Sequence, residues 1–79
     1  MVHTHDVIPV RVTYDPEADA AYFYLVEEIR LGEAVRTVSV DPQSIGGMVN
    51  LDLDADGRIL GLEVLDASRL LRRDVLPEG

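Results

Sequence analysis

Apolar and polar residues alternate along four short stretches of this chain, and a fifth stretch, at residues 21–27, is apolar on both faces. In the first stretch, Val10, Val12 and Tyr14 are separated by single polar residues. A period of two is typical of β-strands that bury one face. Residues that favour turns separate the stretches, so the pattern predicts five strands joined by short connections. Their expected ranges are 10–15, 21–27, 36–40, 48–53 and 58–65.

The segment after the last expected strand predicts a short helix. Asp66 is a favourable N-cap, the helix is expected from Ala67 to about Leu76, and Pro77 ends it. Residues 1–9 are expected to form a flexible N-terminal segment, and residues 10–76 a single small domain. The fold class predicted is therefore α+β, with an antiparallel sheet of about five strands, mostly sequential neighbours, and one short C-terminal helix.

The second expected strand is apolar on both sides. By alternation, Tyr22 and Tyr24 point to one face of the sheet, while Phe23 and Leu25 point to the other. A strand with two apolar faces is usually covered on both. A chain of 79 residues has one helix to offer, so we predict that these four residues form an interaction face.

The charge of the chain is strongly acidic, with 15 Asp and Glu against 7 basic residues and a formal net charge of −8. Nucleic acid and anionic membrane surfaces are disfavoured as partners, because binding them depends on neutralising phosphate charge. A basic protein or a cation is compatible with this charge.

The chain has no cysteine, and its longest apolar run, residues 20–26, is too short to span a membrane. A cytoplasmic location is the simplest expectation.

Residues 52–63 are open to two interpretations. They match the calcium-loop pattern, with carboxylates at Asp52, Asp54, Asp56 and Glu63 and a glycine at the sixth position. They also match a β-hairpin, with alternating apolar residues on both sides of a tight turn. We favour the hairpin, because calcium hands are flanked by helices and both flanks here alternate with period two. Calcium binding through these four carboxylates is the alternative.

Other candidate chemistry is sparse. Asp15 and Asp19, close to two tyrosines, could form an acid cluster for general acid–base catalysis. Turn capping and core packing explain the same residues without catalysis, so a small enzyme using Asp15 and Asp19 is a further alternative. His3 and His5 could bind a transition metal weakly, although a loose tail accounts for them. We assign no catalytic residue, no metal and no cofactor, and predict that the protein is not an enzyme.

Two sequence blocks together resemble a known family. The first is VTYDPEADAAY at residues 12–22, and the second is LDLDADGRILGLEVLDAS at residues 51–68. In this order they resemble a family of small, mostly bacterial proteins, domain of unknown function 2283, over about residues 10–71. The resemblance implies a compact single domain with no assigned activity. Some members are encoded beside small toxin-like proteins, which suggests an antitoxin-like or partner-binding role.

This chain departs from the family's usual pattern in its longer N-terminus and in the aromatic Phe23. The resemblance assigns no functional residue. Taken together, the sequence predicts a small acidic, non-catalytic protein–protein interaction module. Its expected partner is a second copy of the chain, in a homodimer, or a basic protein.

Overall fold

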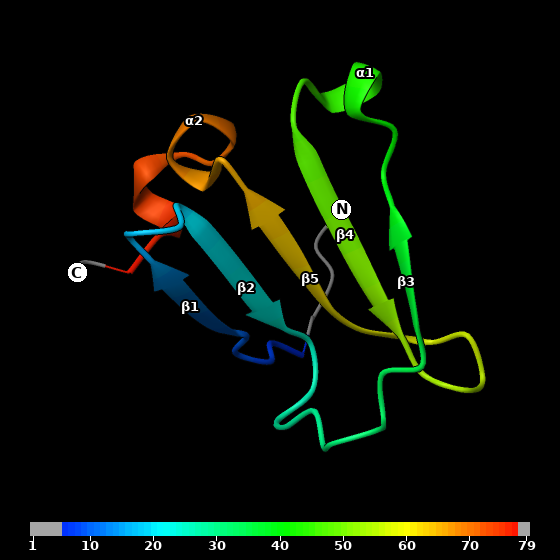
Figure 1. Ribbon diagram of the computed structural model, residues 1–79. Helices are drawn as coiled ribbons and strands as arrows, with labels where there is room; N and C mark the ends of the chain where they lie inside the picture. The colour runs from blue at the N-terminus through cyan, green and yellow to red at the C-terminus, as the bar shows by residue number, and fades with distance from the viewer. Residues whose placement is uncertain (1–5, 78–79) are drawn as a thin grey trace, which may run out of the picture.

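One antiparallel sheet of five strands forms the body of the protein in the computed structural model, which describes residues 6–77 (Figure 1). The spatial order of the strands is β1-β2-β5-β4-β3, so β5 is central and β1 and β3 are the edges. Three of the four adjacent pairs are consecutive along the chain, and the exception is β2 beside β5. The predicted α+β class and strand number are confirmed. The bounds are β1 Arg11–Asp15, β2 Ala20–Tyr24, β3 Arg36–Ser39, β4 Met48–Leu53 and β5 Ile59–Leu65.

Short helices lie at one end of the sheet (Figure 1). They are α1 Pro42–Ile45, α2 Ala67–Leu70 and a 3-10 turn, η1, at Arg73–Val75. The α1 turn was not predicted. The Asp41 side chain caps it by accepting the Gln43 N–H at 3.0 Å. Among residues 6–77, no helix is long and apolar enough to cross a membrane.

The predicted C-terminal helix to Leu76 was wrong in its length, because α2 ends after Leu70 and Leu71 is extended (φ −110°, ψ 147°). Packing explains the break. Leu70, Leu71 and Leu76 all contact the core cluster. In a continuous helix Leu76 would point well away from the side that carries the other two leucines. The break brings all three onto the sheet.

The main core cluster lies between one face of the sheet and this C-terminal segment, and Leu53 and Leu60 are also buried, towards the β4–β5 turn. Strand pairing aligns a row of five residues across all five strands, which we call the core rung. The three central members of the core rung are buried, and Ala67 of α2, with no exposed surface, packs against them. We call this side of the sheet the apolar face. The core rung consists of Tyr14, Ala21, Val64, Val49 and Val40.

The β4–β5 connection is the hairpin that alternation predicted. Asp54 Oδ1 accepts the backbone N–H groups of Asp56 and Arg58, each at 2.9 Å. Gly57 has φ +80°, a left-handed conformation that glycine adopts without strain. A register shift at Asp52/Leu53 marks a bulge beside the turn. Backbone geometry and one carboxylate therefore account for the turn.

The described residues lack a complete second layer over the sheet. The radius of gyration is 14.0 Å, whereas a folded domain of 79 residues has a value of about 11.6 Å. The expected flexible segment at residues 1–9 lies partly outside the described residues, as do His3 and His5.

Candidate functional site

Asp19 joins the β1–β2 turn to α2 by hydrogen bonds. Its Oδ1 accepts the Tyr14 hydroxyl at 2.7 Å and the Ser68 N–H at 3.0 Å, and its Oδ2 accepts the Ser68 hydroxyl at 2.7 Å. Its backbone carbonyl accepts the Ala67 N–H at 3.0 Å. Asp19 therefore caps α2 from a turn 49 residues away in sequence. Asp66 is the N-cap residue of α2 as predicted, but its side chain binds Arg69 and makes no capping hydrogen bond.

The pKa shifts of Asp19 and Tyr14 fit a structural role for this contact and not proton transfer. The Tyr14 hydroxyl, followed by the Ser68 hydroxyl, holds the pKa of the Asp19 carboxyl below its usual value. The hydrogen bond to Asp19 raises the pKa of the Tyr14 phenol. The proton therefore stays on the phenol at neutral pH. Asp15, the other member of the candidate acid pair, accepts the Glu17 N–H on an exposed turn.

The opposite side of the sheet, which we call the polar face, carries a hydrogen-bonded network. Tyr22 Oη donates to Asp52 Oδ2 at 2.5 Å, and Thr37 Oγ1 donates to Asp52 Oδ1 at 2.7 Å. The Tyr22 ring lies over Gly61, where an added Cβ would come within 2.6 Å of the ring. The network ties β2, β4 and β3 together across the polar face.

A second set of polar contacts runs beside the first. Ser39 Oγ donates to Asn50 Oδ1 at 2.7 Å, and Asn50 Nδ2 donates to Glu63 Oε1 at 3.1 Å. These side chains satisfy one another across β3, β4 and β5. The polar face is thus supported by cross-strand hydrogen bonds of the kind that stabilise open sheets.

Partial burial, and then the hydrogen bond to Asp52, raises the pKa of the Tyr22 hydroxyl. Tyr22→Phe is therefore expected to destabilise the fold by about 1 kcal/mol at neutral pH. A phenol whose folded pKa exceeds its unfolded value of about 10 stabilises the fold below that value, and this contribution is lost as the pH rises. Urea unfolding between pH 7 and 11 should show the gap between wild type and Tyr22→Phe narrowing at alkaline pH. A gap that stays constant would contradict this assignment.

The calcium-pattern carboxylates are spread along the β4–β5 hairpin and have separate partners. Asp52 binds Tyr22 and Thr37, Asp54 holds the turn, and Glu63 accepts from Asn50, while Asp56 is exposed in the turn. Within residues 6–77, no group of three or more His, Asp or Glu side chains is placed to hold a metal ion.

The four residues of the predicted interaction face lie on two sides of the sheet. Tyr22 and Tyr24 are on the polar face, whereas Phe23 is on the apolar face. Phe23 belongs to a second row across all five strands, which we call the open rung. Every member is apolar and half-buried or exposed. The open rung consists of Val12, Phe23, Leu62, Leu51 and Val38.

The sequence singled out Phe23 as part of the predicted interaction face and did not single out the other members of the open rung. Leu51 and Leu62 are alternating apolar residues of β4 and β5, a pattern that predicts a strand but not how far its side chains are covered. The sequence pattern did not show how much of the apolar face the C-terminal segment covers. The core rung has this cover, and the open rung beside it keeps its members accessible.

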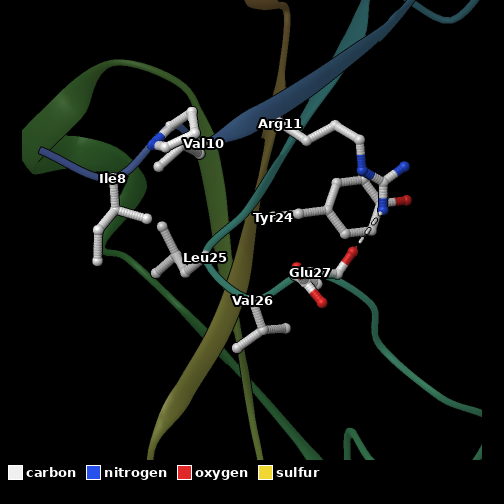
Figure 2. Close-up of a pocket in the computed structure, with 8 residues that line it drawn as sticks. Ile8, Val10, Arg11, Tyr24, Leu25, Val26 and Glu27 are labelled. Atoms are coloured by element: carbon white, nitrogen blue, oxygen red, sulfur yellow. Dashed lines mark hydrogen bonds between the residues drawn. The ribbon is translucent and has the colours of Figure 1, made fainter.

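A shallow groove of about 490 Å³ continues the apolar surface at the end of β2 (Figure 2). Ile8, Val10 and Leu25 gather on one side of the groove in Figure 2, and all three are exposed. On the other side the Arg11 guanidinium lies 3.7 Å from the centre of the Tyr24 ring. This cation–π contact covers one face of the ring and leaves the apolar side of the groove open.

Comparison with known families tests the resemblance that the two sequence blocks suggested. A family model described as "Protein of unknown function (DUF2283)" matches residues 11–68. The chain belongs to this family. The DUF2283 match begins with β1 and ends at Ser68, so it contains all five strands and both partners of the Asp19–Ser68 contact. No curated protein and no solved structure matched the chain.

Proposed function

We propose that this DUF2283 protein is a non-catalytic protein–protein interaction module that binds through the apolar face of its sheet. The observation that carries the proposal is the open rung. It crosses five strands without a polar residue; its edge member Val38 leaves 38% of its surface exposed, and the other four members are half-buried. Contiguous apolar patches on soluble proteins mark binding sites.

The hydrogen bonding of the other candidate residues supports this proposal. Asp19 and Asp52 each hold neighbouring strands or α2 in place, and each has its carboxylate oxygens occupied by donors from the protein itself. A group that caps a helix or ties strands together has a structural role. In the open rung, by contrast, Val12, Leu51 and Val38 are half-buried or exposed and make no such hydrogen bonds.

The proposed partner is a second copy of the chain or a basic protein. The proposed location is the cytoplasm. An antitoxin-like role would be one form of this activity, with a small toxin-like protein as the partner. A basic partner would bind mainly through charge, and its binding would weaken as salt rises. Binding through the apolar face would persist at high salt, because hydrophobic association does not depend on charge.

Affinity capture from the native host tests the proposal. Three immobilised baits are compared: wild type, Val12→Glu on the apolar face, and Thr13→Glu on the polar face. The two variants add the same charge at adjacent positions of β1, and Thr13 is exposed. Wild type and Thr13→Glu should retain the same protein, identified by mass spectrometry, and Val12→Glu should lose it.

Equal capture by all three baits, or loss with Thr13→Glu alone, would contradict the proposal. Circular dichroism on each bait shows whether the variant is folded. Val12 is half-buried on an edge strand, where a glutamate can turn towards water.

A further inference from the structure

We infer that the partner of the open rung is a second copy of this chain, packed face to face in a ten-stranded sandwich dimer. This inference rests on the proposed function and names its partner. Two sheets that pack face to face lie about 10 Å apart, with side chains of the two inner faces interdigitated. The open rung supplies such an inner face.

The distribution of charge allows a second copy to bind at the apolar face. The protein has a formal net charge of −8, so two copies repel one another unless they meet through a neutral surface. Within the five described strands, the apolar face carries no carboxylate, and its one charged residue is Arg36. The polar face, in contrast, carries Asp15, Asp52 and Glu63. The apolar face is the side on which two acidic copies can approach.

The total exposed area of the chain is large for its mass. The chain exposes 6283 Å², whereas a folded monomer of 8.7 kDa exposes about 4,700 Å². A standard interface removes about 800 Å² from each partner, which is roughly half of this excess. The whole chain therefore exposes more surface than a standard interface would bury.

The position of the C-terminal segment sets the symmetry. Leu70, Leu71 and Leu76 stand on one end of the apolar face, over the core rung. A two-fold axis parallel to the strands would bring these segments of the two copies together. An axis along the open rung instead keeps the two segments apart, on opposite sides of that rung. With that axis, Val12 of one copy lies opposite Val12 of the second copy. Val38 likewise lies opposite its own equivalent.

Sedimentation velocity on the purified full chain tests the inference over a range of concentrations. Wild type and Thr13→Glu are expected to be dimers at tens of micromolar. Val12→Glu and Val38→Glu place two like charges against each other across the interface. Each should raise the dimer dissociation constant about a hundredfold or more. Circular dichroism confirms that each variant is folded.

A charge-swap experiment tests the axis. Val38→Glu and Val38→Arg should each be monomeric alone, and their equimolar mixture should form a heterodimer, because position 38 faces itself.

Hydrogen exchange distinguishes a face-to-face dimer from one that pairs through the sheet edges. By the alternation of the β3–β4 ladder, the N–H groups of Thr37 and Ser39 point away from β4 at the sheet edge. These amides should exchange rapidly in a face-to-face dimer and slowly if two β3 edges pair.

A strictly monomeric wild type would overturn the dimer. So would dimers that survive Val12→Glu and Val38→Glu, or slow exchange of the two β3 amides. A mixture of the charge-swap variants that stays monomeric would overturn the symmetric axis. If wild type is monomeric and capture from the host still depends on Val12, the dimer fails while the proposed interaction function stands. If wild type is monomeric and Val12→Glu also leaves capture unchanged, both the dimer and the proposed function are contradicted.

Discussion

Replacing Gly61 with alanine is expected to destabilise the fold by about 1–3 kcal/mol, the usual range for overpacking. Gly61 lies on the central strand, paired with Tyr24 of β2. An added Cβ would come within 2.6 Å of Tyr22 Cε1 and 2.8 Å of the Phe23 carbonyl oxygen. The ring could rotate away, but the carbonyl belongs to a strand paired on both sides. Urea unfolding of wild type and variant at neutral pH measures the loss.

A double-mutant cycle separates the two contacts of Gly61. In the Tyr22→Ala background the ring is absent, so Gly61→Ala should cost less there than in wild type, while the contact with the Phe23 carbonyl remains. A cost below about 0.5 kcal/mol in wild type, typical of a neutral surface change, would show that the close approach is relieved without strain.

Asp19→Ala is expected to lower the midpoint of thermal unfolding by several degrees. The substitution removes three hydrogen bonds, one from Tyr14 and two from Ser68, and leaves α2 without its cap. Alanine is also disfavoured at the observed φ of +49°. Asp19→Asn is the matched control, since asparagine tolerates this conformation and keeps one acceptor oxygen. Its midpoint should lie between those of wild type and alanine.

The pH dependence of the same variants has a defined sign. The folded pKa of Asp19 lies below its unfolded value of about 3.9. Its stabilising contribution is therefore complete above that pH and is lost as the pH falls towards the folded pKa. The stability gap between wild type and Asp19→Asn should be constant from pH 5 to 7 and shrink below about pH 4. A gap that stays constant into acid would contradict a role for the carboxylate charge.

The Asp19 contact also affects the surface proposed for binding. It holds α2 against the end of the sheet, where Ala67 and the following leucines cover the core rung. Releasing α2 would add the core rung to the exposed apolar surface. Asp19→Ala should therefore associate less specifically than wild type, through a larger apolar area.

Local pattern was sufficient to predict the strands. Alternation placed Val49, Leu51 and Leu62 on one side of β4 and β5, and the observed register agrees. The turn at residues 54–57 followed from an aspartate and a glycine at fixed spacing. These features depend on residues close in sequence, so one amino-acid sequence is enough to predict them.

Features that depend on distant contacts were not predicted. The capping of α2 by Asp19 joins residues 49 positions apart, and no local signal identifies such a pair. The helix was expected to reach Leu76, but three leucines pack better on the sheet when Leu71 is extended. The predicted interaction face followed one strand, whereas the open rung crosses five. Its extent became apparent only from the strand order.

The accessibility of the open-rung methyl groups in the assembled protein tests the central claim most directly. Relaxation of methyl resonances by a soluble paramagnetic agent would compare Val12, Val38 and Leu62 on the apolar face with Thr13 on the polar face. At concentrations where the protein is bound to its partner, the three apolar-face methyls should be shielded and Thr13 should stay accessible. Apolar-face methyls as accessible as that of Thr13 under those conditions would contradict the account.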